Sequence, residues 1–512
     1  SGRDARVFST TVSNQDLRNG ANVLRVELMP DTGNWLDSIN VESIRIRYPR
    51  TLLASDDQLA FENPPYFATS GRVDDRIFGH DFDDGGVPGC ESGPDCRSYR
   101  VSGLTRPDVS VVRDRQGHVQ ELQGLRISTT GSSYQLEFSA IALAGDKFRI
   151  QPASGSPVAS IAPALPIADP LAGGNASYLI ITHGMFAPEL SPFVAAKRAE
   201  GFTVRVVDVQ DIYRYFGNGD VDPESISLAL NRAHAELGTR YVLLVGGDTR
   251  DPLNFNGSNA VSFVPTWYRE VGPIVTFAPT DVPFADIDQN GSMDLALGRW
   301  PVRTASELVT QIQKTLAYST ADHGGRMLLV SDRNEARVSF GNALQLLPTV
   351  FGPSWPSTTI DLHQYPANGV QTARNALVSA VNGGQSLLVF MGHAAPLSWT
   401  QEGLVTSQLL NNGLFNNPNK PTVSWVLGCY GTYFTQPQYN SVAHGLMTRS
   451  TSGAAAVFGA STLTEIAHDV AWMNALTPII RAHRLGESIR LAQNALRSEG
   501  EEYKDIWLGV SL

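Results

Sequence analysis

Two segments in the second half of the sequence end in residues that can carry out covalent chemistry together. An apolar run at 386–391 leads into His393, and another at 422–428 leads into Cys429. Parallel strands end at the same edge of a sheet, so both side chains could face one substrate. A thiolate can attack a carbonyl carbon while an imidazole moves protons. A cysteine after an apolar strand is more often a core residue, so the pattern alone leaves both interpretations open.

The rest of the chain must position these residues, and its pattern of apolar and polar residues changes along the sequence. Short runs that alternate with period two lie at 23–28, 44–47 and 134–138, separated by Gly, Asp, Asn and Pro. They predict an all-β, sandwich-like N-terminal domain over residues 1–150. Residues 151–174 are dominated by Pro, Ala, Ser and Gly, which predicts a linker.

From about residue 175, apolar runs rich in β-branched residues alternate with amphipathic stretches, which is typical of a parallel sheet with crossover helices. We expect strands at 178–182, 203–208, 241–245, 294–298, 327–331, 386–391, 422–428 and 454–458. We expect helices at 191–200, 223–237, 304–318, 333–347, 371–381, 442–448 and 485–499. This number of strands favours two α/β subdomains, 175–322 and 323–512, with the second carrying the His and the Cys.

The composition argues against several classes of function. The 512 residues hold 39 basic and 50 acidic side chains, so the net charge is 39 − 50 = −11. This balance argues against a nucleic-acid partner or an anionic membrane surface. No apolar run approaches the roughly 18 residues of a membrane span. The chain has no Walker loop, no dinucleotide-binding glycine motif, no H-E-x-x-H and no G-x-S-x-G, so we expect no organic cofactor.

The three cysteines divide into a close pair and a distant single residue. Cys90 and Cys96 lie in a turn-rich stretch and predict a small disulfide, which favours a secreted or cell-surface protein; two reduced loop thiols are the alternative. Cys429 is then either an inert buried residue or a reactive thiol. No signal peptide is visible at residues 1–24, so a secreted chain would be a processed or excised form.

Longer segments from about residue 177 to residue 512 match a known family in order and spacing. They are YVLLVGGD at 241–248, TDVPFADIDQNG at 280–291, LALGRWPVR at 295–303, MGHA at 391–394, LGCYG at 427–431 and GAAAVFGAS at 453–461. Over these segments the chain resembles the gingipain-type cysteine peptidases of family C25, which have a caspase-like fold. The resemblance implies caspase-like parallel or mixed sheets with flanking helices in both subdomains.

The resemblance also implies catalytic roles. His393 would be the general acid/base, Cys429 the nucleophile, and the main-chain N–H groups of Cys429 and Ala394 the oxyanion hole. The family usually has Gly directly after the catalytic His, where this chain has Ala394. If that position needs a positive φ, Ala394 is strained and activity is weakened. Glu270 lies where some family members have an acidic group that orients the His.

Substrate-binding residues are suggested in the same way. Asp281 matches the acidic residue at the floor of the P1 pocket in family members that cleave after arginine or lysine, and a desolvated carboxylate would pair with such a side chain. The alternative is that Asp281 caps a turn. Trp399 and Tyr430 are candidates for lining the cleft, although buried aromatic residues are commoner as core.

A stretch of acidic and amide residues resembles a calcium-binding loop. Asp286, Asp288, Asn290 and Asp294 occupy positions 1, 3, 5 and 9 of an EF-hand-like pattern, with Gly at position 6. Position 12 is Leu297, where a bidentate Glu is expected. A structural calcium ion is therefore one expectation, and an Asx-rich turn without a metal is the other.

These observations predict a secreted cysteine endopeptidase that cleaves protein or peptide substrates through an acyl-enzyme, with Arg or Lys as the leading P1 residue. Two alternatives remain open: a surface adhesion protein on a catalytically weakened peptidase scaffold, and a sortase-like transpeptidase. The chain stops where family members continue into a Gly-Asp-Pro segment, so we expect the natural protein to be longer.

Overall fold

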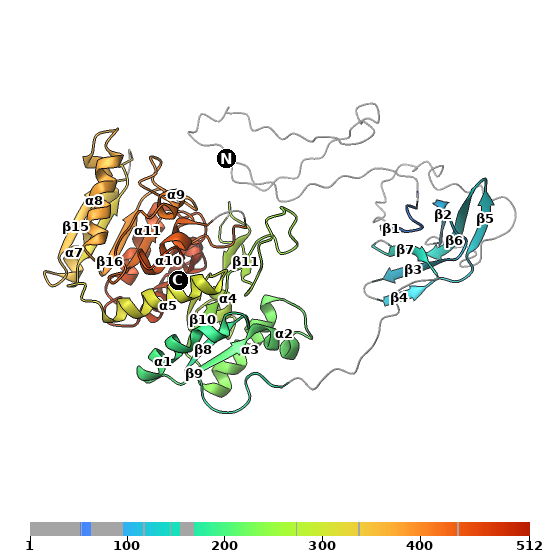
Figure 1. Ribbon diagram of the computed structural model, residues 1–512, viewed down its shortest axis with the longest axis horizontal. Coiled ribbons are helices and arrows are strands. Elements are labelled where there is room, and N and C mark those ends of the chain that lie inside the picture. Colours follow the sequence, from blue (N-terminus) through green and yellow to red (C-terminus); the bar gives the residue numbers. More distant parts are fainter. Residues whose placement is uncertain are drawn as a thin grey trace. The chain divides into compact units, whose positions relative to one another are not determined.

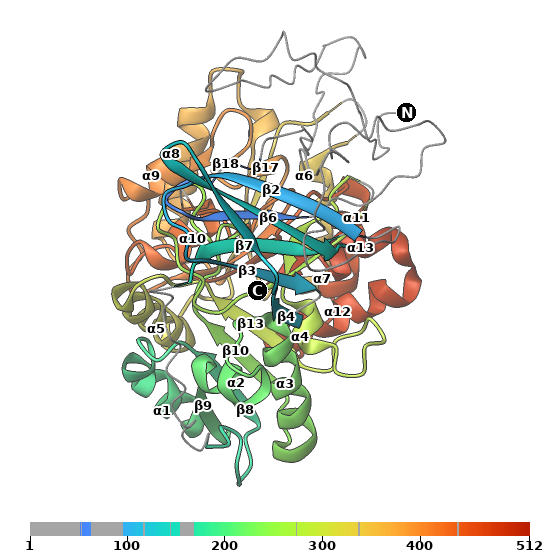
Figure 2. The same cartoon turned by 90° about the vertical axis from the view of Figure 1, so that its right-hand side faces the viewer.

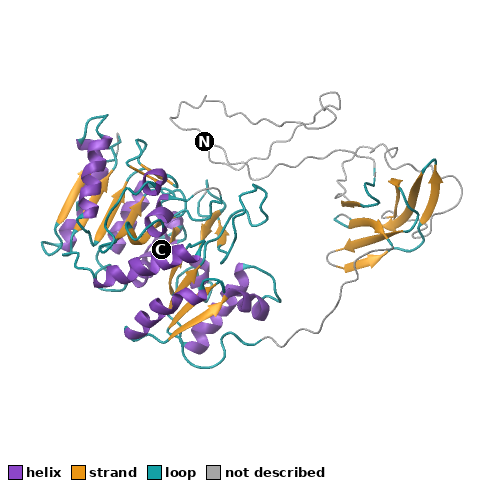
Figure 3. Cartoon of the chain, in the orientation of Figure 1, coloured by secondary structure: helices purple, strands orange, loops and turns teal. Residues whose placement is uncertain are grey.

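The computed structural model describes residues 52, 54–62, 96–115, 118–143, 145–153, 168–272, 274–335, 338–437 and 440–511. The chain forms two compact units, of which the first includes the described residues up to 153 and the second those from 168 onward (Figure 1). Strands and loops make up the first unit, whereas helices and strands alternate in the second (Figure 3). Among the described residues, every helix is too short or too polar to cross a membrane.

The N-terminal unit consists of two antiparallel sheets around one core. The first has the order β1 (Leu59–Glu62), β7 (Lys147–Pro152), β3 (Val109–Arg115), β4 (His118–Glu121). The second has the order β2 (Cys96–Leu104), β6 (Ser133–Ile141), β5 (Arg126–Thr130). Alternate residues such as Val101, Leu136 and Phe148 are buried together. This confirms the sandwich-like all-β class, while the runs at 23–28 and 44–47 lie outside the described residues.

The second unit begins with a four-stranded parallel sheet of order β13 (Ala296–Trp300), β10 (Tyr241–Val245), β8 (Tyr178–Thr182), β9 (Val204–Asp208). A hairpin of β11 (Trp267–Arg269) and β12 (Ala278–Thr280) projects from it (Figure 1). The helices here are α1 (Ser191–Ala199), α2 (Val209–Phe216), α3 (Pro223–Leu237), α4 (Val282–Ala285) and α5 (Ala305–Thr320).

A six-stranded sheet follows, with the order β15 (Ser357–Asp361), β14 (Met327–Ser331), β16 (Leu387–Met391), β20 (Thr422–Leu427), β21 (Ala454–Ala460), β22 (Val510–Ser511). All neighbours are parallel except β22. A small sheet of β17 (Ala394–Ala395), β18 (Ser398–Trp399) and β19 (Val405–Thr406) follows β16. The helices are α6 (Phe340–Ala343), α7 (Leu346–Phe351), α8 (Val370–Asn382), α9 (Ser407–Asn411), α10 (Val442–Thr448), α11 (Ile466–Leu476), α12 (Leu485–Glu499) and α13 (Lys504–Trp507).

The central strands of both sheets are buried on both faces, because successive strand residues enter two different cores. Leu179 and Leu329 belong to one cluster with α3, α11 and α12, while Ile180 and Leu328 belong to the other with α1, α5 and α8. Each cluster contains residues of both sheets, so the two sheets share their cores. Helices α1, α2 and α3 lie near β8 and β9 at one end of this unit in Figure 2. Burial on both faces explains why the strands read as continuous apolar runs.

The expected strands and helices of this unit agree with the structure within two residues, apart from the helix expected at 333–347. That expectation was wrong. The Arg333 guanidinium donates to the main-chain oxygens of Leu362 and Tyr365 and pairs with Glu402 at 2.7 Å, so residues 332–335 do not begin a helix. Only the short helices α6 and α7 form farther on.

Candidate active site

The two predicted catalytic residues leave adjacent parallel strands at one edge of the six-stranded sheet. Met391, the last residue of β16, lies opposite Leu427, the last residue of β20. His393 and Cys429 each follow two residues later, after one glycine. A Cβ at Gly428 would collide with a main-chain carbonyl in the extension of β16. The register and the close main-chain approach therefore bring the main chains of residues 393 and 429 close together at the strand ends.

The imidazole of His393 is held by two carboxylates. Asp332, directly after β14, accepts from Nδ1 at 3.0 Å, and the same oxygen accepts the main-chain N–H of His393 at 3.1 Å. Glu335 Oε1 lies 3.0 Å from Nε2. The side chain of Asp332 is 4% exposed and that of Glu335 is 46% exposed. The hydrogen bond that His393 donates to Asp332 is the largest influence, and with Glu335 it raises the pKa of His393 despite burial. The structure therefore favours the imidazolium over the neutral ring more strongly than water does.

Asp332 and Glu335, rather than Glu270, are the carboxylates that orient the imidazole. Glu270 is an exposed residue directly after β11, whereas each ring nitrogen of His393 already has a carboxylate at 3.0 Å. We missed these two residues because we expected a helix to begin at Arg333. The available signal was Asp332 itself, a polar residue at the end of an apolar strand.

Cys429 is a free thiol whose hydrogen bonds, among the described residues, go to Thr464. The Thr464 N–H donates to Sγ at 3.5 Å, and Sγ donates to the Thr464 carbonyl at 3.6 Å. Burial, as the largest cause, raises the pKa of the Cys429 thiol, and the carboxyl groups of Asp469 and Asp505 raise it further. Cys429 is therefore a protonated thiol at neutral pH rather than a standing thiolate.

Ala394 is compatible with an oxyanion hole. Its φ is negative, so the position does not require glycine. Ala394 lies opposite Trp399 in the β17–β18 pair, and the next pair is closed by the Thr400 N–H, which donates to the His393 carbonyl at 2.8 Å. Hydrogen-bonded and non-bonded pairs alternate in antiparallel strands, so the Ala394 N–H points away from β18. The strain we had considered at Ala394 is absent.

A sequence model of peptidase family C25 matches residues 172–509. The chain belongs to peptidase family C25. It is therefore a cysteine peptidase, whose substrates are proteins or peptides. A comparison with curated protein sequences gives no match.

Two solved structures are similar to this C25 chain. The Arg-specific cysteine proteinase gingipain R (RgpB) has a TM-score of 0.51 and 18% identity over 68% of this chain and 78% of its own. The complex of the Porphyromonas gingivalis RgpB pro- and mature domains has a TM-score of 0.51 and 17% identity over 65% and 78%. At this identity the likeness shows the fold, and it confirms the predicted caspase-like α/β class.

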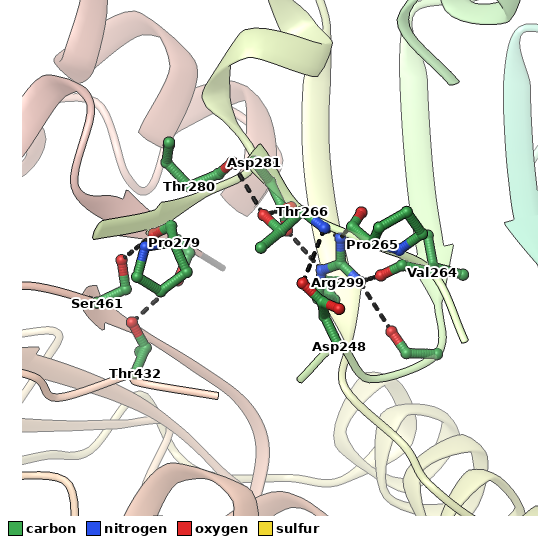
Figure 4. A network of polar contacts seen from close by, with 12 residues as sticks. Asp248, Val264, Pro265, Thr266, Pro279, Thr280, Asp281, Arg299, Thr432 and Ser461 are labelled. Atoms are coloured by element: carbon green, nitrogen blue, oxygen red, sulfur yellow. Dashed lines mark hydrogen bonds and ion pairs between the residues drawn. The ribbon is translucent and has the colours of Figure 1, made fainter. Parts of the chain in front are cut away.

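In this C25 chain, Asp281 cannot serve as the floor of a P1 pocket as we expected. Its side chain is 4% exposed and forms a two-bond ion pair with Arg299, at 2.6 and 2.8 Å. Thr266 Oγ1 donates to the same carboxylate at 2.6 Å (Figure 4). The remaining guanidinium hydrogens of Arg299 go to the main-chain oxygens of Gly246, Val264 and Pro265. With its charge already neutralised, Asp281 has none left for a substrate cation. Its side chain does not cap α4 either.

The two aromatic candidates are placed differently. Trp399 is 1% exposed and stacks on Phe390 with ring centroids 4.7 Å apart, so it is a core residue and not part of a cleft. Tyr430 is partly exposed next to the thiol, with its ring edge-on to Tyr433 at 5.5 Å. Its φ of 53° is uncommon for a residue other than glycine and marks a sharp turn directly after Cys429. Lining of the cleft by Tyr430 stays a prediction.

The predicted calcium loop brings three carboxylates together. Carboxylate oxygens of Asp286, Asp288 and Asp294 lie within 4.8 Å of one another. Burial, followed by the charges of the other two carboxylates, raises the pKa of Asp286. Asn290 instead donates its side-chain N–H to Asp288 at 2.9 Å, and its main-chain N–H donates to the carboxylates of Asp286 and Asp288. The donor set fits a hard cation such as calcium, and the hydrogen bonds also form Asx turns.

The predicted Cys90–Cys96 disulfide lies outside what the structure describes. Cys90 is not among the described residues, and only the main chain of Cys96 is, at the start of β2.

Proposed function

We propose that this C25 chain is a secreted endopeptidase that cleaves proteins through an acyl-enzyme on Cys429, with His393 as general acid/base. The observation that carries the proposal is the register of β16 and β20, which ends both strands at the residue pair, together with the two carboxylates on the imidazole. Secretion is supported by the sequence alone, through the spacing of Cys90 and Cys96.

The environments of both residues suggest the order of proton transfers. The thiol gives its proton to solvent water as Sγ bonds to the substrate carbonyl carbon, and the carbonyl oxygen becomes an oxyanion facing the N–H groups of Ala394 and Cys429. The imidazolium of His393 then donates a proton to the departing amine as the C–N bond breaks. In the second half, a water attacks the thioester and His393 takes its proton. The C–S bond then breaks to release the acid and a thiolate, which regains its proton from solvent water.

The proposal assigns no P1 preference. Cleavage after Arg or Lys depended on Asp281, and the ion pair with Arg299 removes that support. The adhesion alternative depended on strain at Ala394, and the negative φ removes that support as well.

We also propose that Asp286, Asp288 and Asp294 bind a structural calcium ion. A divalent cation would relieve the mutual repulsion of the three carboxylates and fix the loop that leads into β13. The loop takes no part in the proposed chemistry.

The test is hydrolysis of a fluorescently labelled, denatured protein by the wild-type chain and by Cys429→Ala and His393→Ala. We expect both variants to fold and to lose activity by several orders of magnitude. His183→Ala is a matched control, because His183 also follows a strand and precedes a glycine. Its ring contacts Phe263 and the Met185 N–H, whereas the ring of His393 contacts two carboxylates. Full activity of Cys429→Ala would refute the proposal. Ligated product in the presence of an amine acceptor would favour the transpeptidase instead.

A further inference from the structure

A second polar cluster lies directly behind the nucleophile. Thr464 precedes α11, and its hydroxyl donates to Asp469 Oδ2 at 2.9 Å. Asp469, in the first turn of α11, is 3% exposed. A buried carboxyl group with a side-chain partner is costly to keep in a fold, and here its partner is the residue that holds the thiol.

The main chain of Thr464 contacts the sulfur in two opposite ways. Its N–H donates to Cys429 Sγ, which stabilises a thiolate, and its carbonyl accepts from Sγ, which stabilises the neutral thiol. A small rotation or shift of this peptide segment changes the balance between the two contacts. The side chain that anchors Thr464 therefore affects the protonation of the nucleophile.

The neighbouring residue is anchored from a different element. The main-chain N–H of Glu465 donates to Asp505 Oδ2 at 3.1 Å, and Asp505 also contacts His468 Nδ1 at 2.9 Å. Asp505 belongs to α13, whereas Asp469 belongs to α11. The segment against the thiol is thus fixed by two carboxyl groups from two helices.

We propose that Asp469 is a positioning residue for the nucleophile, acting through its hydrogen bond with Thr464 to hold the main chain that contacts Cys429 Sγ. The inference rests on the proposed function, because it takes Cys429 as the nucleophile. Its structural basis is the continuous chain of contacts from a buried carboxyl group through one hydroxyl to the sulfur.

The charges around the sulfur determine in which direction the pKa of Cys429 should change when Asp469 is replaced. Burial is the main cause that raises the pKa of Asp469, to about 8, so the group is neutral at lower pH and becomes negative in the range where the thiol begins to ionise. Asp505 is a charged group that acts on both Cys429 and Asp469, and Asp505 itself interacts with His468 and Glu465. A negative Asp469 opposes formation of the Cys429 thiolate. It also offsets the partial positive charge at the N-terminal end of α11, which favours a nearby anion.

The test is the rate at which iodoacetamide alkylates Cys429, followed by peptide mass spectrometry across a range of pH. In Asp469→Asn, the amide oxygen can still accept the Thr464 hydrogen bond, but the charge is gone. We expect the midpoint of the alkylation profile to fall by roughly half to one pH unit, which makes alkylation about 3- to 10-fold faster at mildly alkaline pH. Alkylation reports on the thiol without requiring turnover, so it separates this inference from peptidase activity.

A second pair of variants tests the hydroxyl group of Thr464, and one of them should slow alkylation. Thr464→Val removes the hydroxyl that bonds Asp469 and loosens the N–H contact with sulfur, so we expect alkylation to slow by roughly 2- to 5-fold. Thr464→Ser keeps the hydroxyl and should restore the wild-type profile. Asp248→Asn is the matched control, since Asp248 is also buried with a raised pKa but binds Thr266 and Ser262 in the first subdomain. It should leave the profile unchanged.

Unchanged midpoints in both Asp469→Asn and Thr464→Val, with wild-type Cys429 alkylated normally, would overturn this inference and leave the proposed function intact. Failure of iodoacetamide to modify wild-type Cys429 at any pH would overturn both. If Asp469→Asn does not fold, the contrast between the Thr464→Val and Thr464→Ser profiles decides alone.

Discussion

Replacing Asp332 by Asn tests whether a buried carboxylate controls the catalytic imidazole. The amide oxygen of Asn can still accept from the main-chain N–H of His393 and from Nδ1, so the geometry is kept while the charge is removed. A hydrogen bond to a charged partner contributes about 1.5–3 kcal/mol, against about 1 kcal/mol for a neutral one. The difference of about 0.5–2 kcal/mol corresponds to a loss of roughly 2- to 30-fold in kcat.

The pH profile of kcat should shift in one direction when Asp332 is replaced by Asn. Asp332 is the largest cause that raises the pKa of His393, so removing its charge lowers that pKa. The proposed general acid is the imidazolium, and the alkaline limb of kcat against pH should therefore move to lower pH. In the same way, the raised pKa stabilises the folded protein below the ordinary pKa of histidine, and this contribution is lost as pH rises through the folded-state value. Asp332→Asn should lose part of its stability on the acid side only.

Glu335→Gln is the matched comparison, because Glu335 contacts the other ring nitrogen at the same distance but is 46% exposed. Water and salt screen exposed pairs to about 0–1 kcal/mol, so we expect a loss of less than about fivefold. The assay is hydrolysis of the labelled protein substrate from about pH 5 to pH 9. An unchanged pH profile in Asp332→Asn, or an equal or larger effect of Glu335→Gln, would refute the argument from burial.

Three further predictions concern stability. Arg299→Met leaves the Asp281 carboxylate buried without its partner, so the free energy of unfolding in urea should fall by about 3–5 kcal/mol, and no change would mean that the pair is solvated. Chelation of calcium should lower Tm in the wild-type chain but not in Asp288→Asn; equal shifts would argue against the site. Burial lowers the pKa of Lys314 from its ordinary value of 10.5 to about 7, so its contribution makes stability rise with pH between these values. Lys314→Met should flatten that rise in thermal melts, and an unaltered slope would contradict the reasoning.

The sequence contained enough information for the strands and for the pair of strand-end residues. Runs such as 386–391 are apolar on both faces because each face enters a different core, and this makes them visible without tertiary information. The glycines before His393 and Cys429 are also visible in the sequence. A side chain at Gly428 would collide with the main chain that extends β16, so only glycine lets the two strand extensions approach.

Side-chain contacts that depend on the order of the strands in the sheet could not be predicted in this way. Asp332 reaches His393 across 61 residues because β14 lies next to β16, and no local pattern contains that adjacency. The same limit applies to Asp281. A matching motif suggests a role for the carboxylate, but only the fold shows that Arg299, 18 residues farther on, neutralises it.

The contacts of the resting site bear on how the proposed reaction begins. The Cys429 thiol bonds to the main chain of Thr464, and both imidazole nitrogens of His393 bond to carboxylates. One environment raises the pKa of the thiol and the other raises the pKa of the imidazole, so the thiol keeps its proton while the imidazole gains one. A standing thiolate–imidazolium pair would require the opposite shift at the sulfur. The proposed acyl-enzyme step therefore starts from a neutral thiol, and a neutral thiol is less readily oxidised than a thiolate.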